Sequence, residues 1–142
     1  MIRSLHFVSD DQIAAIGMGV AERTLPKAEW THAAHFATAL WLIQEGRDGE
    51  LPGLIRAYNV SVGGVNSDTE GYHETITQAS LAAARAFLRE REGEPLHQVC
   101  NALLASPCGR SDWLLTHWSK AALFSVDARR GWVAPDVTPL PF

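Results

Sequence analysis

Three histidines of this chain, His32, His35 and His73, have a residue type and a spacing suited to chemistry. His32 and His35 lie three residues apart near the start of one predicted helix, and His73 lies near the start of another. On both helices the imidazoles fall on the side that the apolar residues mark as buried. A buried polar ring needs a hydrogen-bond or metal partner, so the cluster predicts a place for ligand contact or catalysis.

Other polar side chains are expected on the same inward side. Glu74 falls at the border of the apolar stripe that contains His73, and Tyr58 faces inward from the preceding segment. We interpret His73, Glu74 and Tyr58 as candidate catalytic groups, because together they offer an acid, a base and a hydrogen-bond donor. The candidate ligand-binding residues are His32, His35, Tyr72, Thr77 and Asn66.

The histidine spacing also fits a metal site. Two histidines three residues apart on a helix can bind one ion, and a third ligand would leave an open catalytic position. The set His32, His35 and His73 therefore makes a divalent transition metal a candidate cofactor. A glycine-bounded loop would add oxygen ligands suited to iron, manganese or zinc, from Asn66, Asp68 and Glu70.

Two alternatives compete with a metal. The positive end of a helix favours anions, so the same imidazoles could help to bind a carboxylate or a phosphate. A purely structural interpretation is also open: Trp30 precedes a Thr31 cap in the staple position, which would stack His35 on Trp30. His73 would then be a core histidine bonded to Thr77 or to a loop carbonyl.

The elements that position these residues are predicted to be helices. Capping signals and helical periodicity place main helices at about 10–23, 32–45, 51–62, 72–91 and 95–105, with short helical segments at 112–117 and 125–130. No stretch alternates with period two as a strand would. We therefore expect an all-α fold, a compact helical bundle of about five main helices. Its proline-containing C-terminal tail should lie extended.

Composition limits the class of protein. At 142 residues and 46% hydrophobic content, residues 1–142 should form a single helical domain. The net charge is −4 and the basic residues are scattered, which argues against nucleic acid and anionic membranes as partners. We find no signal-peptide pattern and no apolar run of membrane-spanning length, so we expect a cytoplasmic protein. Cys100 and Cys108 should be reduced thiols.

Aromatic residues outside the cluster suggest assembly and packing. Trp41 falls on the predicted outward face of its helix, where Ala34 and Ala37 would complete an apolar patch, so a homodimer is expected as one option. Trp113, Trp118 and Trp132 should be anchors of the core and the tail. No role is assigned to His6, His97 and His117.

The combined pattern resembles a known family. Trp30-Thr31-His32-x-x-His35-Phe36, followed by Tyr58-Asn59 and then by Tyr72-His73-Glu74-Thr75-x-Thr77, is similar to a family of small uncharacterised bacterial all-helical proteins. The similarity spans most of residues 29–136. It implies a helical fold and points again to the histidines, Tyr58 and Glu74, but it implies no substrate or cofactor.

Three hypotheses of function follow. The first is a small acid/base or metal-dependent enzyme that acts on a small polar or anionic molecule, in a pocket between the second, third and fourth helices. The second is a non-catalytic module that binds a small anion or a protein partner. In the third, the histidines are structural and any function lies in assembly through the Trp41 side.

Overall fold

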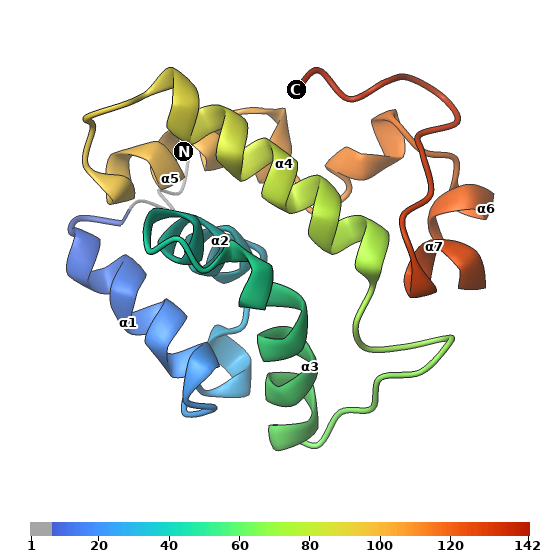
Figure 1. Ribbon diagram of the computed structural model, residues 1–142, viewed down its shortest axis with the longest axis horizontal. Helices are drawn as coiled ribbons and strands as arrows, with labels where there is room; N and C mark the ends of the chain where they lie inside the picture. The colour runs from blue at the N-terminus through green and yellow to red at the C-terminus, as the bar shows by residue number, and fades with distance from the viewer. Residues whose placement is uncertain (1–6) are drawn as a thin grey trace, which may run out of the picture.

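Helices and turns account for all the regular structure in the computed structural model, which describes residues 7–142 (Figure 1). The α-helices are α1 (Asp10–Ala21), α2 (His32–Gln44), α3 (Leu51–Ser61), α4 (Glu74–Glu90), α5 (Leu96–Ala105), α6 (Lys120–Leu123) and α7 (Val126–Arg130). Short 3-10 turns are η1 (Lys27–Glu29), η2 (Asp48–Glu50), η3 (Pro107–Gly109) and η4 (Trp113–Thr116). No strand occurs in these residues, and the predicted all-α fold is confirmed. His6 lies outside the described part of the chain.

The centre of the fold is α2. It begins where the Thr31 hydroxyl accepts a hydrogen bond from the Ala34 N–H at 3.2 Å, and it packs against α1, α4 and α5. Leu40 and Leu42 have no exposed surface. A helix covered on several sides can be apolar almost all round, and this explains why α2 has no clear outward stripe.

The predicted outward position of Trp41 is wrong. Trp41 is 9% exposed, and Ala34 and Ala37 are fully buried beside it. The indole lies against Gly17 of α1, where a Cβ atom would overlap the ring. The apolar patch that suggested a homodimer is therefore the contact between α1 and α2, so that surface does not support self-association.

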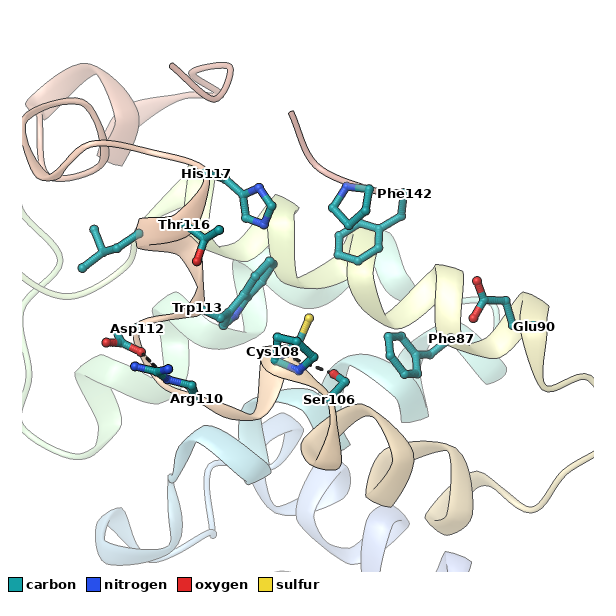
Figure 2. Close-up of a pocket in the computed structure, with 13 residues that line it drawn as sticks. Phe87, Glu90, Ser106, Cys108, Arg110, Asp112, Trp113, Thr116, His117 and Phe142 are labelled. Carbon is teal, nitrogen blue, oxygen red and sulfur yellow. Dashed lines mark hydrogen bonds and ion pairs between the residues drawn. The ribbon is translucent and has the colours of Figure 1, made fainter. Parts of the chain in front are cut away.

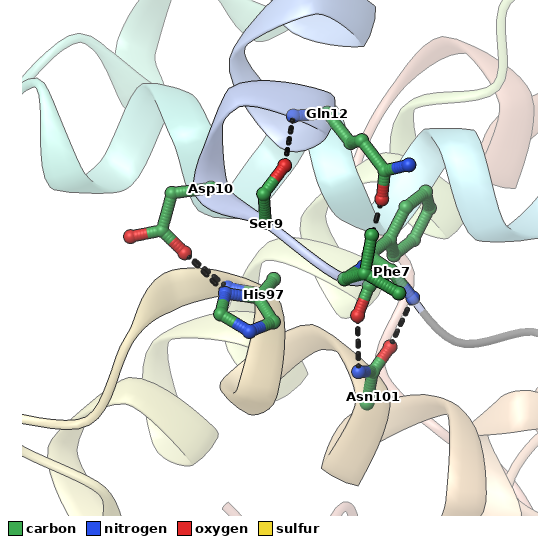
Figure 3. Close-up of polar contacts among 7 residues, drawn as sticks. Phe7, Ser9, Asp10, Gln12, His97 and Asn101 are labelled. Atoms are coloured by element: carbon green, nitrogen blue, oxygen red, sulfur yellow. Dashed lines mark hydrogen bonds and ion pairs between the residues drawn. The ribbon is translucent and has the colours of Figure 1, made fainter.

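The start of α1 is fastened to α5 by side chains (Figure 3). The backbone N–H of Phe7 donates to the Asn101 Oδ1 at 2.8 Å, and the Asn101 Nδ2 donates to the Phe7 carbonyl at 2.9 Å. Asp10 Oδ1 accepts hydrogen bonds from both the backbone N–H and the ring Nδ1 of His97, at 2.8 and 2.7 Å. His97 thus has a structural role at this junction.

The longest helix, α4, begins two residues later than predicted, and the difference changes the position of His73. His73 is not in the middle of the buried stripe of a helix that starts at Tyr72. It is the N-cap, with extended backbone angles, and its ring accepts a hydrogen bond from the Ile76 N–H. At the N-cap, His73 is therefore buried by the segments that pack over the start of α4, and not by the apolar side of α4 itself.

The C-terminal part folds over the start of α4 as two short helices and a tail without helix (Figure 1). The predictions missed α6, a single turn capped by Ser119. Trp118 is completely buried and donates from Nε1 to the Val133 carbonyl at 2.9 Å, so it anchors the tail as expected. Within residues 7–142, the helices are too short or too polar to cross a membrane.

Candidate functional site

A cavity of about 300 Å³ lies between α2, α3 and α4, where the sequence predicted a pocket. We call it the His35 cavity. Its walls are formed by Trp30, His35, Ile55, Asn59, Gly71, Tyr72, His73, Ile76, Thr77 and Ser80. A smaller cavity of about 80 Å³ adjoins it, shares three wall residues with it and is also lined by His32. The three shared residues are His35, Ile76 and Ser80.

His35 occupies the junction of the two cavities. Its ring is stacked on Trp30, with 3.7 Å between ring centroids and 23° between planes, as the staple pattern predicted. Neither ring nitrogen bonds to another described residue. The surrounding protein lowers the pKa of His35 from its usual value near 6.5, and His32 lowers it further. His35 is an exposed residue, so its predicted buried position is wrong. Water at the ring moderates the shift without changing its sign, and His35 is neutral at pH 7.

His73 is locked into the fold through both ring nitrogens. Nδ1 accepts from the Ile76 N–H at 3.1 Å, and Nε2 lies 2.6 Å from the Leu123 carbonyl oxygen. Since a carbonyl can only accept, the ring is the neutral tautomer with its proton on Nε2. Burial is the main reason that the pKa of His73 is lowered. The ring has no free nitrogen for a ligand, a metal or a proton transfer.

His32 also serves the fold. Its Nε2 donates to the carbonyl of Cys108 at 2.8 Å, which joins the start of α2 to η3. The ring also meets Phe36 edge to face, with 5.1 Å between centroids. His32 contributes to the wall of the smaller cavity, one helical turn from His35.

Tyr58 lies away from the cavity walls. The side chain is completely buried and donates from its hydroxyl to the Leu25 carbonyl at 2.8 Å. Burial raises the pKa of Tyr58, so the phenol stays protonated. This hydrogen bond connects α3 to the turn that follows α1.

Glu74 and Tyr72 are engaged with each other. The Tyr72 hydroxyl donates to Glu74 Oε1 at 2.5 Å, and Gln78 donates to Glu74 Oε2 at 3.1 Å. Burial and the neighbouring carboxylate raise the pKa of Tyr72. The guanidinium of Arg56 lies 4.1 Å from the centre of the Tyr72 ring. The structure thus does not bring the three predicted catalytic groups, His73, Glu74 and Tyr58, to one point.

In the polar loop before α4, the side chain of Asn66 makes hydrogen bonds that hold the loop in its shape. Asn66 Oδ1 accepts from Asn59 and from the Tyr72 N–H, each at 3.0 Å, while its Nδ2 donates to the Arg56 carbonyl. Asp68 pairs with Arg130 of α7 through two hydrogen bonds. The predicted ligand Asn66 therefore makes three hydrogen bonds that hold the loop in its shape.

Thr77 lies in the cavity wall, but its hydroxyl donates to the His73 carbonyl at 2.9 Å. Ser80, one turn further along α4, is the polar residue that sequence reasoning missed. Ser80 lines both cavities, and its hydroxyl bonds to no other described residue. A signal was available, because a serine at a position of the apolar stripe needs a partner.

No metal-binding group is present among residues 7–142, because no three histidine, cysteine, aspartate or glutamate side chains have suitable positions. In the predicted set, His73 cannot serve as a ligand because both of its ring nitrogens are bonded within the fold. His35 is left as the histidine with free nitrogens in the cavity.

Comparison with protein-family models, with curated proteins and with solved structures finds no match. The resemblance to bacterial helical proteins therefore stays a prediction.

Proposed function

We propose that the protein binds a small neutral molecule in the His35 cavity. The proposal rests on one difference: the other candidate groups are hydrogen-bonded within the fold, and the ring nitrogens of His35 are not. Both ring nitrogens of His35 have no hydrogen-bond partner among the described residues, and Ser80, whose hydroxyl also has none, lines the same space. A flat ligand could lie against the stacked rings of Trp30 and His35 and exchange hydrogen bonds with His35 and Ser80.

The charge of the cavity favours a neutral ligand. Its walls contain no aspartate, glutamate, lysine or arginine, and His35 is neutral at pH 7. An anion or a cation would lose hydration there without gaining a partner of opposite charge. The helix starts that could have favoured an anion are already capped, by Thr31 for α2 and by His73 for α4.

Binding is proposed in preference to an acid/base or metal-dependent reaction. The groups that such a reaction would use are bonded within the fold, Glu74 to Tyr72 and His73 to Leu123. His35 is the remaining candidate base, and its lowered pKa makes it a weak proton acceptor at neutral pH.

Three isosteric probes test the proposal by calorimetry at pH 7: benzamide is neutral, benzoate is an anion and benzamidinium is a cation. Benzamide should bind with saturation, and both ions at least tenfold more weakly. His35→Phe keeps the stack on Trp30 but removes the nitrogens, and Ser80→Ala removes the hydroxyl. Each should weaken benzamide binding about fivefold, since one hydrogen bond contributes about 1 kcal/mol.

The control is Thr24→Val, which removes an exposed hydroxyl outside the His35 cavity and outside the smaller cavity beside it, and should leave benzamide binding unchanged. The proposal is contradicted if none of the probes shows saturable binding, or if an ion binds as tightly as benzamide. Unchanged benzamide affinity in His35→Phe would also contradict it.

A further inference from the structure

A second and larger cavity, of about 680 Å³, lies between the end of α4, the η3–η4 segment and the C-terminal tail (Figure 2). We call it the aromatic pocket. Trp113, Phe87 and Phe142 form three of its sides, and they come from three separate parts of the chain. Trp113 also lines the smaller cavity beside His35, so one indole separates the two binding regions. The volume is in the range of natural small-molecule sites.

The interior of the aromatic pocket suits an aromatic ligand. Figure 2 shows the sulfur of Cys108 directed into the space between Trp113, Phe87 and Phe142. Cys108 is 6% exposed. Aromatic rings favour edge-to-face or offset contacts with another ring, and sulfur makes favourable contacts with ring edges.

The charged side chains at the rim each have an ion-pair partner. Arg110 Nε lies 3.3 Å from Asp112 Oδ1, and Glu90 Oε2 lies 3.5 Å from the guanidinium of Arg91. A charged ligand would therefore find no unpaired charged side chain of aspartate, glutamate, lysine or arginine among the described residues of the rim. A neutral ligand needs no partner of opposite charge.

Two polar groups in the pocket can still bind a ligand. The Thr116 hydroxyl bonds to no other described residue. His117 Nδ1 lies 3.1 Å from the Thr138 carbonyl oxygen and must donate to it. A neutral ring protonated at Nδ1 has a free lone pair on Nε2, so His117 can accept a hydrogen bond. No role was predicted for this histidine from the sequence.

The walls of the pocket are held in place before any ligand arrives. The tail is tied to His117, whose carbonyl accepts from the Val137 N–H at 2.9 Å and from the Thr138 N–H at 3.3 Å. Phe142 is thereby kept near Trp113, with 6.3 Å between ring centroids in an edge-to-face arrangement. A preformed site loses less conformational entropy on binding.

We propose that the aromatic pocket is a second binding site, for a neutral aromatic small molecule with one hydrogen-bond donor directed at His117. The ligand ring lies between Phe87, Trp113 and Phe142, next to the Cys108 sulfur. This site is independent of the His35 cavity, and neither proposal needs the other.

Probes with one ring system and three charges test this proposal: 2-naphthalenemethanol, 2-naphthoate and 2-naphthylmethylammonium. Binding is measured by calorimetry, and its location by the rate at which N-ethylmaleimide labels Cys108. The neutral alcohol should bind with saturation, slow the labelling of Cys108 at least fivefold, and bind at least tenfold more tightly than either ion. Cys100 has no exposed surface and is the internal reference, because it is labelled only when the fold opens.

Variants separate this site from the others. Phe142→Ala should weaken binding of the alcohol at least fivefold while the melting temperature stays within about 2 °C, because the residue lies at the rim. Phe124→Ala is the matched control: Phe124 is 57% exposed and lies outside the pocket. His35→Phe should also leave the alcohol's affinity unchanged.

Three results would overturn the proposal. The first is an absence of saturable binding by the alcohol, and the second is tighter binding of either ion. The third is an unchanged rate of Cys108 labelling when the alcohol is bound, because the ligand would then lie elsewhere.

Discussion

At the scale of single residues, three histidines of similar sequence context have different tasks. His73 and His32 each reach a backbone carbonyl from a distant part of the chain, and those bonds fix them as structural groups. His35 finds only the face of Trp30, so its nitrogens remain available. The residue type is the same in all three cases, and the nearby acceptors decide the role.

Replacing His73 should destabilise the protein. His73→Ala removes the cap of α4 and leaves the Leu123 carbonyl without its partner, which should lower the free energy of unfolding by about 2–3 kcal/mol. His73→Asn can restore the cap but not the bond to Leu123, so about half of the loss should remain. Urea unfolding monitored by circular dichroism measures both. A loss below about 0.5 kcal/mol in His73→Ala would show that the ring is not structural.

The stability of the protein should fall as the pH drops below about 6.5. The pKa of His73 is lowered in the folded state, so the unfolded chain takes up a proton at a pH where the folded protein does not. The contribution of this histidine is therefore complete above the unfolded pKa and is lost as the pH falls through the folded one. Urea unfolding between pH 5 and pH 8 should show a smaller pH dependence in His73→Asn than in the unchanged protein. Equal slopes would contradict the lowered pKa.

At the scale of elements, the residues that cap or end helices predicted where the helices lie along the chain. The sequence of α2 did not indicate which side of this helix faces solvent. Thr31 caps α2 as predicted, and Ser9 caps α1. However, α2 is apolar on nearly every side, so its sequence does not mark which side faces solvent. Trp41 was placed outward for this reason, although it fills the space that Gly17 of α1 leaves.

A pair of glycine substitutions tests this helix contact. Alanine usually stabilises a helix interior by up to about 1 kcal/mol relative to glycine. Gly17→Ala should instead destabilise the protein by about 1–3 kcal/mol, because the new Cβ overlaps the Trp41 indole. Gly53→Ala in α3 is the control, since nothing lies within 4 Å of its Cβ position, and it should show the usual gain. Stabilisation by both substitutions in thermal unfolding would contradict the packing of Trp41 on α1.

At the scale of the whole molecule, contacts between distant segments decide the candidate sites. The partners of His73 and His32 lie 50 and 76 residues away in the chain. The sequence predicted three inward histidines, of which His73 is buried and His35 is exposed. Local periodicity cannot indicate which carbonyl will reach each ring. The aromatic pocket was missed for the same reason, because Phe87, Trp113 and Phe142 come together only when the tail folds back.

The tail should depend on Asp136. Its carboxylate accepts from the Ser119 backbone N–H at 2.8 Å and from the Ser119 hydroxyl at 2.6 Å, next to the point where the Val137 N–H bonds to the His117 carbonyl. Asp136→Ala should therefore speed amide hydrogen exchange of Val137 at least tenfold, while amides in α2 stay protected. Asp11→Ala, at the exposed start of α1, is the control. Unchanged exchange at Val137 would mean that the carboxylate does not hold the tail.

The most direct test of the central claim is to follow the histidine ring carbons by nuclear magnetic resonance during a titration with benzamide at pH 7. The account predicts that the His35 signal moves with saturation, while the His73 signal stays in place as a neutral ring protonated at Nε2. If the His73 signal moved and the His35 signal did not, or if neither moved, the proposed division between a structural and a ligand-binding histidine would be contradicted.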